Sequence, residues 1–359
     1  MSKTFGVKEA AALARKEILS LKPYTSKPYP RAVKLDANEN PFPWPDGMRE
    51  ELLGAELSLN RYPDGGAQEL KRALAGYTGV SETGILPGNG SDELIQLIFT
   101  VFGGEGRAVV LHPPTFVMYE TAARVTGTKV EEVPLRDDLR LDAEGIIKAA
   151  SAPAAHVIIL CNPNNPTGSR FAQEDILEII RESGKVVVVD EAYAEFSGAS
   201  MVEMVSRYPN LLIMRTFSKA FGLAGLRLGY LLGQDEIIDL LNRARQPFNV
   251  NAFSQKAGVT ALRYESEYKK QIAVIQKEIG KIYRELNEIP GIRAYPTAAN
   301  FVLFQCAAPA QLAEDLWARG FLVRNLGDIP VLGPSLRMSS GLPEENGRFL
   351  RAVREAMQE

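Results

Sequence analysis

The feature that most constrains the fold is a series of short apolar runs that alternate with helical segments. Most of these runs lack a polar and apolar alternation, which is typical of strands buried on both faces. Apolar strands separated by helices predict an α/β protein whose mostly parallel sheet is covered on both sides. The predicted strands are Ala108–Leu111, Lys129–Pro134, Val157–Leu160, Val186–Val189, Leu211–Met214 and Leu228–Leu232.

Several functional side chains follow these strands directly. Sheets of this kind bind their ligands beyond the carboxyl ends of the strands. The side chains that fall at those ends are Phe116, Asn165, Asp190, Tyr193 and Lys219. The pattern therefore predicts that they meet in one site, although up to about a hundred positions separate them in the sequence.

Lys219 lies among apolar and small residues after the run Leu211–Met214. Burial lowers the pKa of a lysine, and a partly neutral amine can attack a carbonyl to form a Schiff base. Thr216, Ser218 and Arg227 supply donors for an anion nearby. A nucleophilic lysine beside an anion clamp suits pyridoxal phosphate. The alternative is a strand, a turn and a lysine that extends to solvent.

The remaining residues supply what that cofactor needs. Asp190 follows four valines, where a carboxylate is costly without a partner such as a pyridinium nitrogen. Asn165 and Tyr193 can donate to the phenolic oxygen of the ring, and Phe116 can stack on its face. Ser91 and Asp92 begin a helix whose free N–H groups can bind the phosphate. Alone, Asp190 could instead cap a helix and Asn165 could be a turn residue.

The chain resembles the fold-type I pyridoxal-phosphate aminotransferases from end to end, and within them most closely the histidinol-phosphate aminotransferase group. The motifs that carry the resemblance are Ala37–Pro41, Asn60–Pro63, Gly90–Glu93, Asn164–Gly168, Asp190–Tyr193, Ser218–Gly229 and Arg337–Gly341. Where the family commonly has a ring-stacking tyrosine, this chain has Phe116.

The resemblance implies a ping-pong transamination in histidine biosynthesis, from L-histidinol phosphate to 2-oxoglutarate. Lys219 would hold the cofactor and then move the proton, with Asp190 and Tyr193 as the other catalytic residues. Tyr24, Asn165, Arg324 and Arg337 would bind the substrate. A homodimer is implied, in which Tyr62 reaches the phosphate of the neighbouring subunit. An aromatic amino-acid aminotransferase and a threonine-phosphate decarboxylase share these motifs and remain alternatives. The intact Lys219, Asp190 and Arg227 argue against a binding protein that has lost activity.

The length of 359 residues indicates two domains. We expect residues 1–40 to form a helix (Val7–Leu21) and a proline-rich arm that pack on the smaller domain. Residues 41–248 would form the large cofactor-binding domain. Residues 249–359, which begin with a long helix from about Ala252 to Leu286, would form a small α/β domain.

Composition narrows the classes of function. A net charge of −3 does not favour nucleic-acid binding, and no apolar run is long enough to span a bilayer. Two cysteines cannot build a disulfide framework, which predicts a cytoplasmic location. With only two histidines, metal sites and Ser-His-Asp chemistry are not expected.

Overall fold

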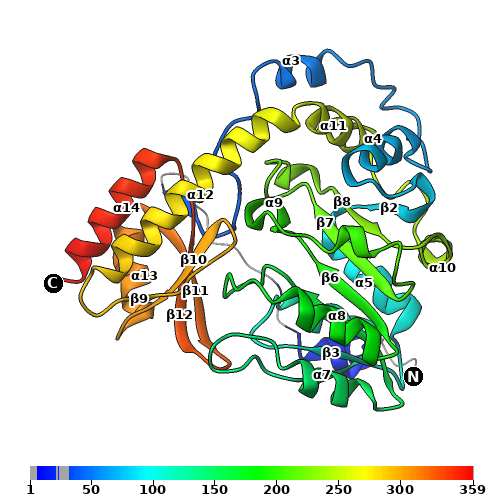
Figure 1. Cartoon of the computed structure of the whole chain (residues 1–359), viewed down its shortest axis with the longest axis horizontal. Coiled ribbons are helices and arrows are strands. Elements are labelled where there is room, and N and C mark those ends of the chain that lie inside the picture. Colours follow the sequence, from blue (N-terminus) through cyan, green and yellow to red (C-terminus); the bar gives the residue numbers. More distant parts are fainter. Residues whose placement is uncertain (1–5, 22, 24–31, 359) are drawn as a thin grey trace.

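The computed structural model describes residues 6–21, 23 and 32–358, which form two sheets linked by the long helix α12 (Glu265–Asn287) (Figure 1). The larger sheet has seven strands, and its order is β2-β8-β7-β6-β5-β3-β4. Their bounds are β2 Ile85–Gly88, β3 Ala108–Leu111, β4 Lys129–Glu132, β5 Ala155–Cys161, β6 Val186–Asp190, β7 Leu211–Thr216 and β8 Gly229–Leu232.

The predicted mostly parallel sheet is confirmed. Strands β3 to β7 run parallel, and only β8 is antiparallel to its neighbours β7 and β2. In the register, Cys161 at the end of β5 lies beside Asp190 at the end of β6, which lies beside Met214 in β7. The three central strands therefore end along one edge, and the residues that follow them share that edge.

Helices cover both faces of this sheet, as the apolar runs require. Along β6, Val188 packs in one cluster, while Val187 and Val189 pack in another on the opposite face. The first face carries α5 (Gly90–Phe102), α6 (Met118–Thr126) and α10 (Asp235–Ala244). The second face carries α4 (Gln68–Thr78), α7 (Ala143–Ala150), α8 (Gln173–Glu182), α9 (Ala194–Ser197) and α11 (Ala252–Arg263).

The smaller sheet has the order β1-β11-β12-β10-β9. Its strands are β1 Val33–Leu35, β9 Arg293–Ala294, β10 Phe301–Gln305, β11 Phe321–Ile329 and β12 Gly333–Ser339, with α13 (Pro309–Ala318) and α14 (Pro343–Ala356) packed beside them (Figure 1). The three-residue strand β1 pairs in parallel with β11. The N-terminal part of the chain is thus joined to the C-terminal sheet before residues 36–40 reach the large sheet.

The structure corrects two predicted helices. Instead of one helix over Val7–Leu21 there are two short ones, α1 (Val7–Ala12) and α2 (Lys16–Leu19), and neither buries a side chain. The predicted helix from Ala252 breaks at Tyr264 into α11 and α12. The apolar side chains of this segment stay exposed, Val7 at 86% and Leu13 at 77%, so packing in this chain does not hold one long helix together.

The described part of residues 1–40 touches both domains. Arg15 donates from Nη1 to the carbonyl of Val125 on α6, at 2.8 Å, whereas β1 joins the small sheet. Helix α11 packs on α4 and on α3 (Met48–Leu53), so it lies with the large domain. The domain limits at residues 40 and 248 stay a prediction. In the described residues, no helix combines the length and apolarity that crossing a membrane needs.

Candidate active site

The central strands deliver three predicted residues to one edge of the large sheet. Asp190 is the last residue of β6, Asn165 follows β5 and Lys219 follows β7. Opposite them, residues 36–40 pass from the small sheet over this edge. Lys219 Nζ donates to the carbonyl of Ala37 at 2.8 Å, so the two domains meet at the lysine. The sequence did not predict this contact.

The surroundings of Lys219 suit a nucleophile. Burial and the positive charge of Arg337 together lower the pKa of this amine to about 8, while Glu39 opposes the shift. A lysine with a pKa near 8 is neutral in about a tenth of molecules at pH 7, far more than an exposed lysine. This fraction can attack an aldehyde without a separate base.

Asp190 is held by two donors. Its side chain is 4% exposed, and burial raises its pKa to about 6. Tyr119 donates its hydroxyl proton to Oδ2 at 2.6 Å, and the N–H of Ala192 donates to Oδ1 at 3.0 Å. Both bonds favour the carboxylate form, which can pair with a cationic nitrogen. Tyr119 lies in the first turn of α6, and no signal in the sequence marked it.

Tyr193 and Asn165 face the same region from neighbouring strand ends, and each is already bonded on one side. The Tyr193 hydroxyl accepts a hydrogen bond from Asn38 Nδ2 at 2.9 Å. Asn165 Oδ1 accepts one from Arg337 Nη1 at 2.5 Å. Each therefore keeps a donor to offer, as the predicted contact with a phenolic oxygen requires. Asn38, which the sequence analysis placed only within the motif Ala37–Pro41, makes a second contact that was not predicted.

The half-buried ring of Phe116 packs edge-on against Tyr119, with 5.5 Å between ring centres. Phe116 therefore lies next to the side chain that bonds Asp190. This placement agrees with the predicted stacking role, which stays a prediction because the ring it would face is a ligand.

The start of α5 forms a cup for an anion. The first N–H groups of a helix lack partners within it, and here they belong to Gly90, Ser91 and Asp92. Arg227 lies beside them and pairs through Nη2 with the Asp92 carboxylate at 2.8 Å. This ion pair was not predicted, because Asp92 was expected to act through its backbone only.

Glycine is required at two points of this cup. Gly90 has a φ of +80°, and a Cβ there would lie 2.6 Å from Arg227 Nη2. A Cβ on Gly229 would lie 2.9 Å from the backbone nitrogen of Ser91. Thr216 and Ser218 are buried beside them, and the Ser218 N–H donates to Thr216 Oγ1 at 3.1 Å. The small residues leave room where a phosphate would approach the backbone.

Two predicted arginines lie opposite each other in the small sheet. Arg324 in β11 and Arg337 in β12 are direct partners in the antiparallel register. Arg337 is 8% exposed, bonds the carbonyl of Asp36 at 2.8 Å and lies over the ring of Phe301. Tyr24, the other predicted substrate residue, lies outside the described residues.

Tyr62 differs from the other predicted site residues because it lies on the surface. Its side chain is 81% exposed and stacks on Phe248, with 4.5 Å between ring centres. The structure does not bring it to the other phosphate residues of its own chain through any contact among the described residues.

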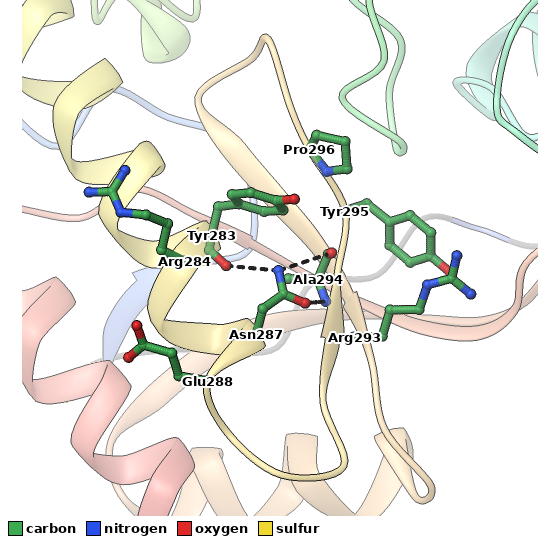
Figure 2. Close-up of a pocket in the computed structure, with 8 residues that line it drawn as sticks. All are labelled: Tyr283, Arg284, Asn287, Glu288, Arg293, Ala294, Tyr295 and Pro296. Carbon is green, nitrogen blue, oxygen red and sulfur yellow. Dashed lines mark hydrogen bonds between the residues drawn. The ribbon is translucent and has the colours of Figure 1, made fainter.

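A separate hollow of about 580 Å³ lies between the end of α12 and β9 (Figure 2). No residue of the active site lines it. Figure 2 shows Asn287 bonded to the backbone of Tyr283 and Ala294, so its amide is occupied by the fold. The hollow carries no set of reactive groups, and the chemistry belongs to the edge of the large sheet.

The residues present fit pyridoxal phosphate. A buried amine of lowered pKa, a carboxylate held ionised and a glycine-lined cup at a helix start match its aldehyde, ring nitrogen and phosphate. Fold and site together define an enzyme of the pyridoxal-phosphate-dependent aminotransferase class. Residues 30–353 match the family model described as aminotransferase class I and II, and the chain belongs to this family.

Particular relatives narrow the comparison. The chain is 59% identical to a histidinol-phosphate aminotransferase of Desulfitobacterium hafniense, over 96% of this chain and 97% of that protein. It is 38% identical to the enzyme of the same name from Pyrococcus furiosus, over 96% and 98%. The solved histidinol-phosphate aminotransferase of Sinorhizobium meliloti, in complex with pyridoxal-5'-phosphate, superimposes with a TM-score of 0.87 at 26% identity, over 97% and 98%.

Proposed function

We propose that this aminotransferase transfers the amino group of L-histidinol phosphate to 2-oxoglutarate, giving imidazole acetol phosphate and L-glutamate in histidine biosynthesis. The name shared by the relatives supports this substrate, and the length of the match supports its transfer to this chain. The observation in the site that carries it is the pair of arginines on β11 and β12.

That pair favours a substrate with a doubly charged anion. Opposite residues of an antiparallel pair point to one face, and like charges there repel. An anion between Arg324 and Arg337 would contact both guanidinium groups. The phosphate of histidinol phosphate offers three acceptor oxygens to guanidinium groups, whereas an amino acid such as phenylalanine offers one carboxylate. Asn165, bonded to Arg337, would link the bound anion to the reacting end.

The other residues of the site each have a separate role in the reaction. Bound pyridoxal phosphate supplies an aldehyde and an electron-withdrawing ring. Lys219 Nζ would take the proton from the substrate carbon that bears the amine and return it to the cofactor carbon bonded to the same nitrogen, because its lowered pKa suits both directions of transfer. Asp190 keeps a positive charge on the ring nitrogen, and Tyr193 and Asn165 donate to the phenolic oxygen. Arg227 and the start of α5 hold the phosphate.

A panel of amino donors with purified enzyme and 2-oxoglutarate tests the proposal. Glutamate formation with histidinol phosphate should show the highest kcat/KM. A higher value with phenylalanine would make the chain an aromatic amino-acid aminotransferase. Carbon dioxide release from threonine phosphate would make it a decarboxylase; a solved threonine-phosphate decarboxylase shares the fold at 23% identity.

The arginine pair is tested by Arg337→Gln. The loss of charge-assisted bonds worth about 1.5–3 kcal/mol should lower kcat/KM for histidinol phosphate about 10- to 100-fold. The loss for phenylalanine should be smaller if phosphate is what the pair binds. Arg293→Gln, in the same domain but at the separate hollow, is the matched control and should change neither value. Equal losses for both donors would contradict the phosphate assignment.

The same proposal includes a homodimer in which Tyr62 reaches the phosphate of the neighbouring subunit. Its support is a set of exposed apolar side chains: Phe248, on which Tyr62 stacks, is 42% exposed, and Leu59, three positions before Tyr62, is 76% exposed. Exposed large apolar side chains that lie together mark interaction sites. It also includes a cytoplasmic location, which the two free cysteines favour.

A further inference from the structure

Asn38 is a buried residue with a demanding backbone. Its side chain is 1% exposed and its φ is +54°, in the left-handed region that asparagine tolerates better than most residues. It follows β1 and spans the space between the two sheets. Its backbone carbonyl accepts a bond from Asn300 Nδ2 at 3.1 Å, so the turn is held from the small domain.

Ser339 at the end of β12 fixes which way the Asn38 amide points. The Asn38 N–H donates to Ser339 Oγ at 2.7 Å, and Ser339 Oγ donates to Asn38 Oδ1 at 3.1 Å. A hydroxyl has a single proton, and here it is given to Oδ1. The Asn38 nitrogen Nδ2 is therefore left on the other side, where it donates to the Tyr193 hydroxyl at 2.9 Å.

This bond determines what the Tyr193 hydroxyl can do. Because the oxygen accepts from Asn38, its own proton must point elsewhere. Among residues 6–21, 23 and 32–358, no group bonded to Tyr193 accepts that proton. The ring is 3% exposed and packs edge-on against Phe301 with 5.2 Å between centres, so the side chain cannot turn to solvent. Burial also raises the pKa of Tyr193, which keeps the proton on the oxygen.

Asn165, which follows the neighbouring strand β5, likewise accepts a hydrogen bond that leaves its donor free to point elsewhere. Arg337 occupies its oxygen, which leaves its nitrogen to donate. Arg337 donates to the carbonyl of Asp36, and Asn38 accepts from Ser339 on β12, so both are held on the small-domain side of the site. Two donors from the large sheet thus receive their direction from groups across the site.

We propose that Asn38 is a positioning residue that sets the direction of the Tyr193 hydroxyl, so that this hydroxyl donates to the phenolic oxygen of the cofactor. The inference rests on the proposed binding of pyridoxal phosphate. It assigns to Asn38 no contact with substrate or cofactor. Its consequence is electrostatic: a donor aimed at the phenolic oxygen stabilises the anionic form and lowers the pH at which the bound cofactor loses its proton.

The test is the pH midpoint of the cofactor's visible absorption in Asn38→Asp. A carboxylate of the same shape accepts and cannot donate, so the Tyr193 proton turns to it and is lost to the cofactor. The midpoint should rise by about one to two pH units, the shift that a lost bond to a charged group produces. The band in the unmodified enzyme tests cofactor binding itself, and the difference between variants tests Asn38.

Asn38→Gly distinguishes a role in orienting the Tyr193 hydroxyl from a role that is only structural. Glycine accepts a φ of +54° without strain, and the Tyr193 hydroxyl stays free to donate. We expect a smaller shift than in Asn38→Asp. A role that is only structural predicts the opposite order, because Asn38→Gly removes both hydrogen bonds of the side chain, whereas Asn38→Asp keeps a side chain of the same shape in place. A shift in Asn38→Gly as large as in Asn38→Asp would overturn the proposal.

Two controls exclude a simple effect of added charge. In a Tyr193→Phe background, Asn38→Asp and Asn38→Gly should each cause almost no further shift, because the hydroxyl they act through is absent. Asn40→Asp places the same charge two residues along, where the side chain bonds Ala220 and Gln271, and should shift the midpoint less. A full shift from Asn38→Asp in the Tyr193→Phe background would refute the coupling. If Asn38→Asp does not fold, the Asn38→Gly and Tyr193→Phe cycle decides alone.

Discussion

The two sides of the active site are built in different ways. On the large-sheet side, Asp190 ends its own strand and is bonded by Ala192, two residues along. On the small-domain side, the bonds of Asn38 to Ser339 and of Arg337 to Asp36 each join residues 301 positions apart. The first side is fixed by a continuous sheet, and the second only when two distant parts of the chain meet. We therefore expect the first to carry the chemistry and the second to set orientation and substrate.

Lys219→Ala should have the largest effect and would sharpen this contrast most. It removes both the amine that holds the cofactor and the base that moves the proton. Turnover should fall by at least about 10⁴-fold, the upper end of what general acid–base catalysis contributes. The protein should still bind pyridoxal phosphate through the other contacts. Steady-state kinetics and the visible spectrum measure the two effects.

Lys148→Ala, exposed on α7, is the control and should behave as the unmodified enzyme. Borohydride reduction followed by peptide mapping should place the cofactor on Lys219. A label on any other lysine would contradict the assignment.

Asp190→Asn comes next in size. The amide is neutral, so the ring nitrogen loses the charge that keeps it protonated. Turnover should fall about 10²- to 10³-fold, as when a preorganised buried electrostatic partner is removed. Cofactor affinity should fall only about tenfold, the value of one charge-assisted bond. A variant with normal turnover at saturating cofactor would show that Asp190 does not pair with the ring.

The sequence predicted the first side of the site better than the second. The apolar runs that make β5, β6 and β7 are local signals, and each placed Asn165, Asp190 or Lys219 at its end. Asn38 on the second side carried no such signal, and neither did Tyr119 on the first, because an Asn in a turn and a Tyr in a helix have many uses. Their roles depend on contacts with Tyr193 and Asp190 that only the assembled sheets create. The three-residue strand β1 is likewise too short to be recognised before its partner β11 is known.

Tyr119→Phe should have a smaller effect, seen most clearly as pH dependence. Burial raises the Asp190 pKa to about 6, and the Tyr119 hydroxyl works against that rise. Without this donor the Asp190 pKa rises further. Because the protonated acid cannot pair with a cationic ring, cofactor affinity falls off below the Asp190 pKa. This acid limb should therefore move to higher pH in the variant.

Cofactor titrations of Tyr119→Phe and the unmodified enzyme between pH 5 and 8 would measure this shift of the acid limb. The lost bond to a charged group is worth about 1.5–3 kcal/mol at most. Phe102→Leu, at the end of α5 on the same face of the sheet, is a control that should leave the pH limb in place. An unchanged acid limb in Tyr119→Phe would mean that the 2.6 Å bond does not hold the carboxylate ionised.

The smallest expected effect tests whether the active site is built from one chain or from two. Tyr62 stands apart from both, exposed and stacked on Phe248. If Tyr62 binds the cofactor phosphate of the neighbouring subunit, a second chain contributes a third side to each site. Tyr62→Phe alone should weaken cofactor binding by the value of one bond to a charged phosphate, about 1.5–3 kcal/mol. Assays at limiting cofactor make this defect visible.

Mixing Tyr62→Phe with Lys219→Ala subunits then decides the geometry. A mixed dimer has two sites related by the two-fold axis. If Tyr62 acts across the interface, one site combines the intact Lys219 with an intact Tyr62 from its partner, and the other site has both defects. Activity should then recover to about half that of the unmodified dimer, since one of two sites is whole. If Tyr62 serves its own chain, the site with Lys219 keeps the tyrosine defect. Mixing would then give no gain over Tyr62→Phe, and the active site would be complete with the two sides of a single chain.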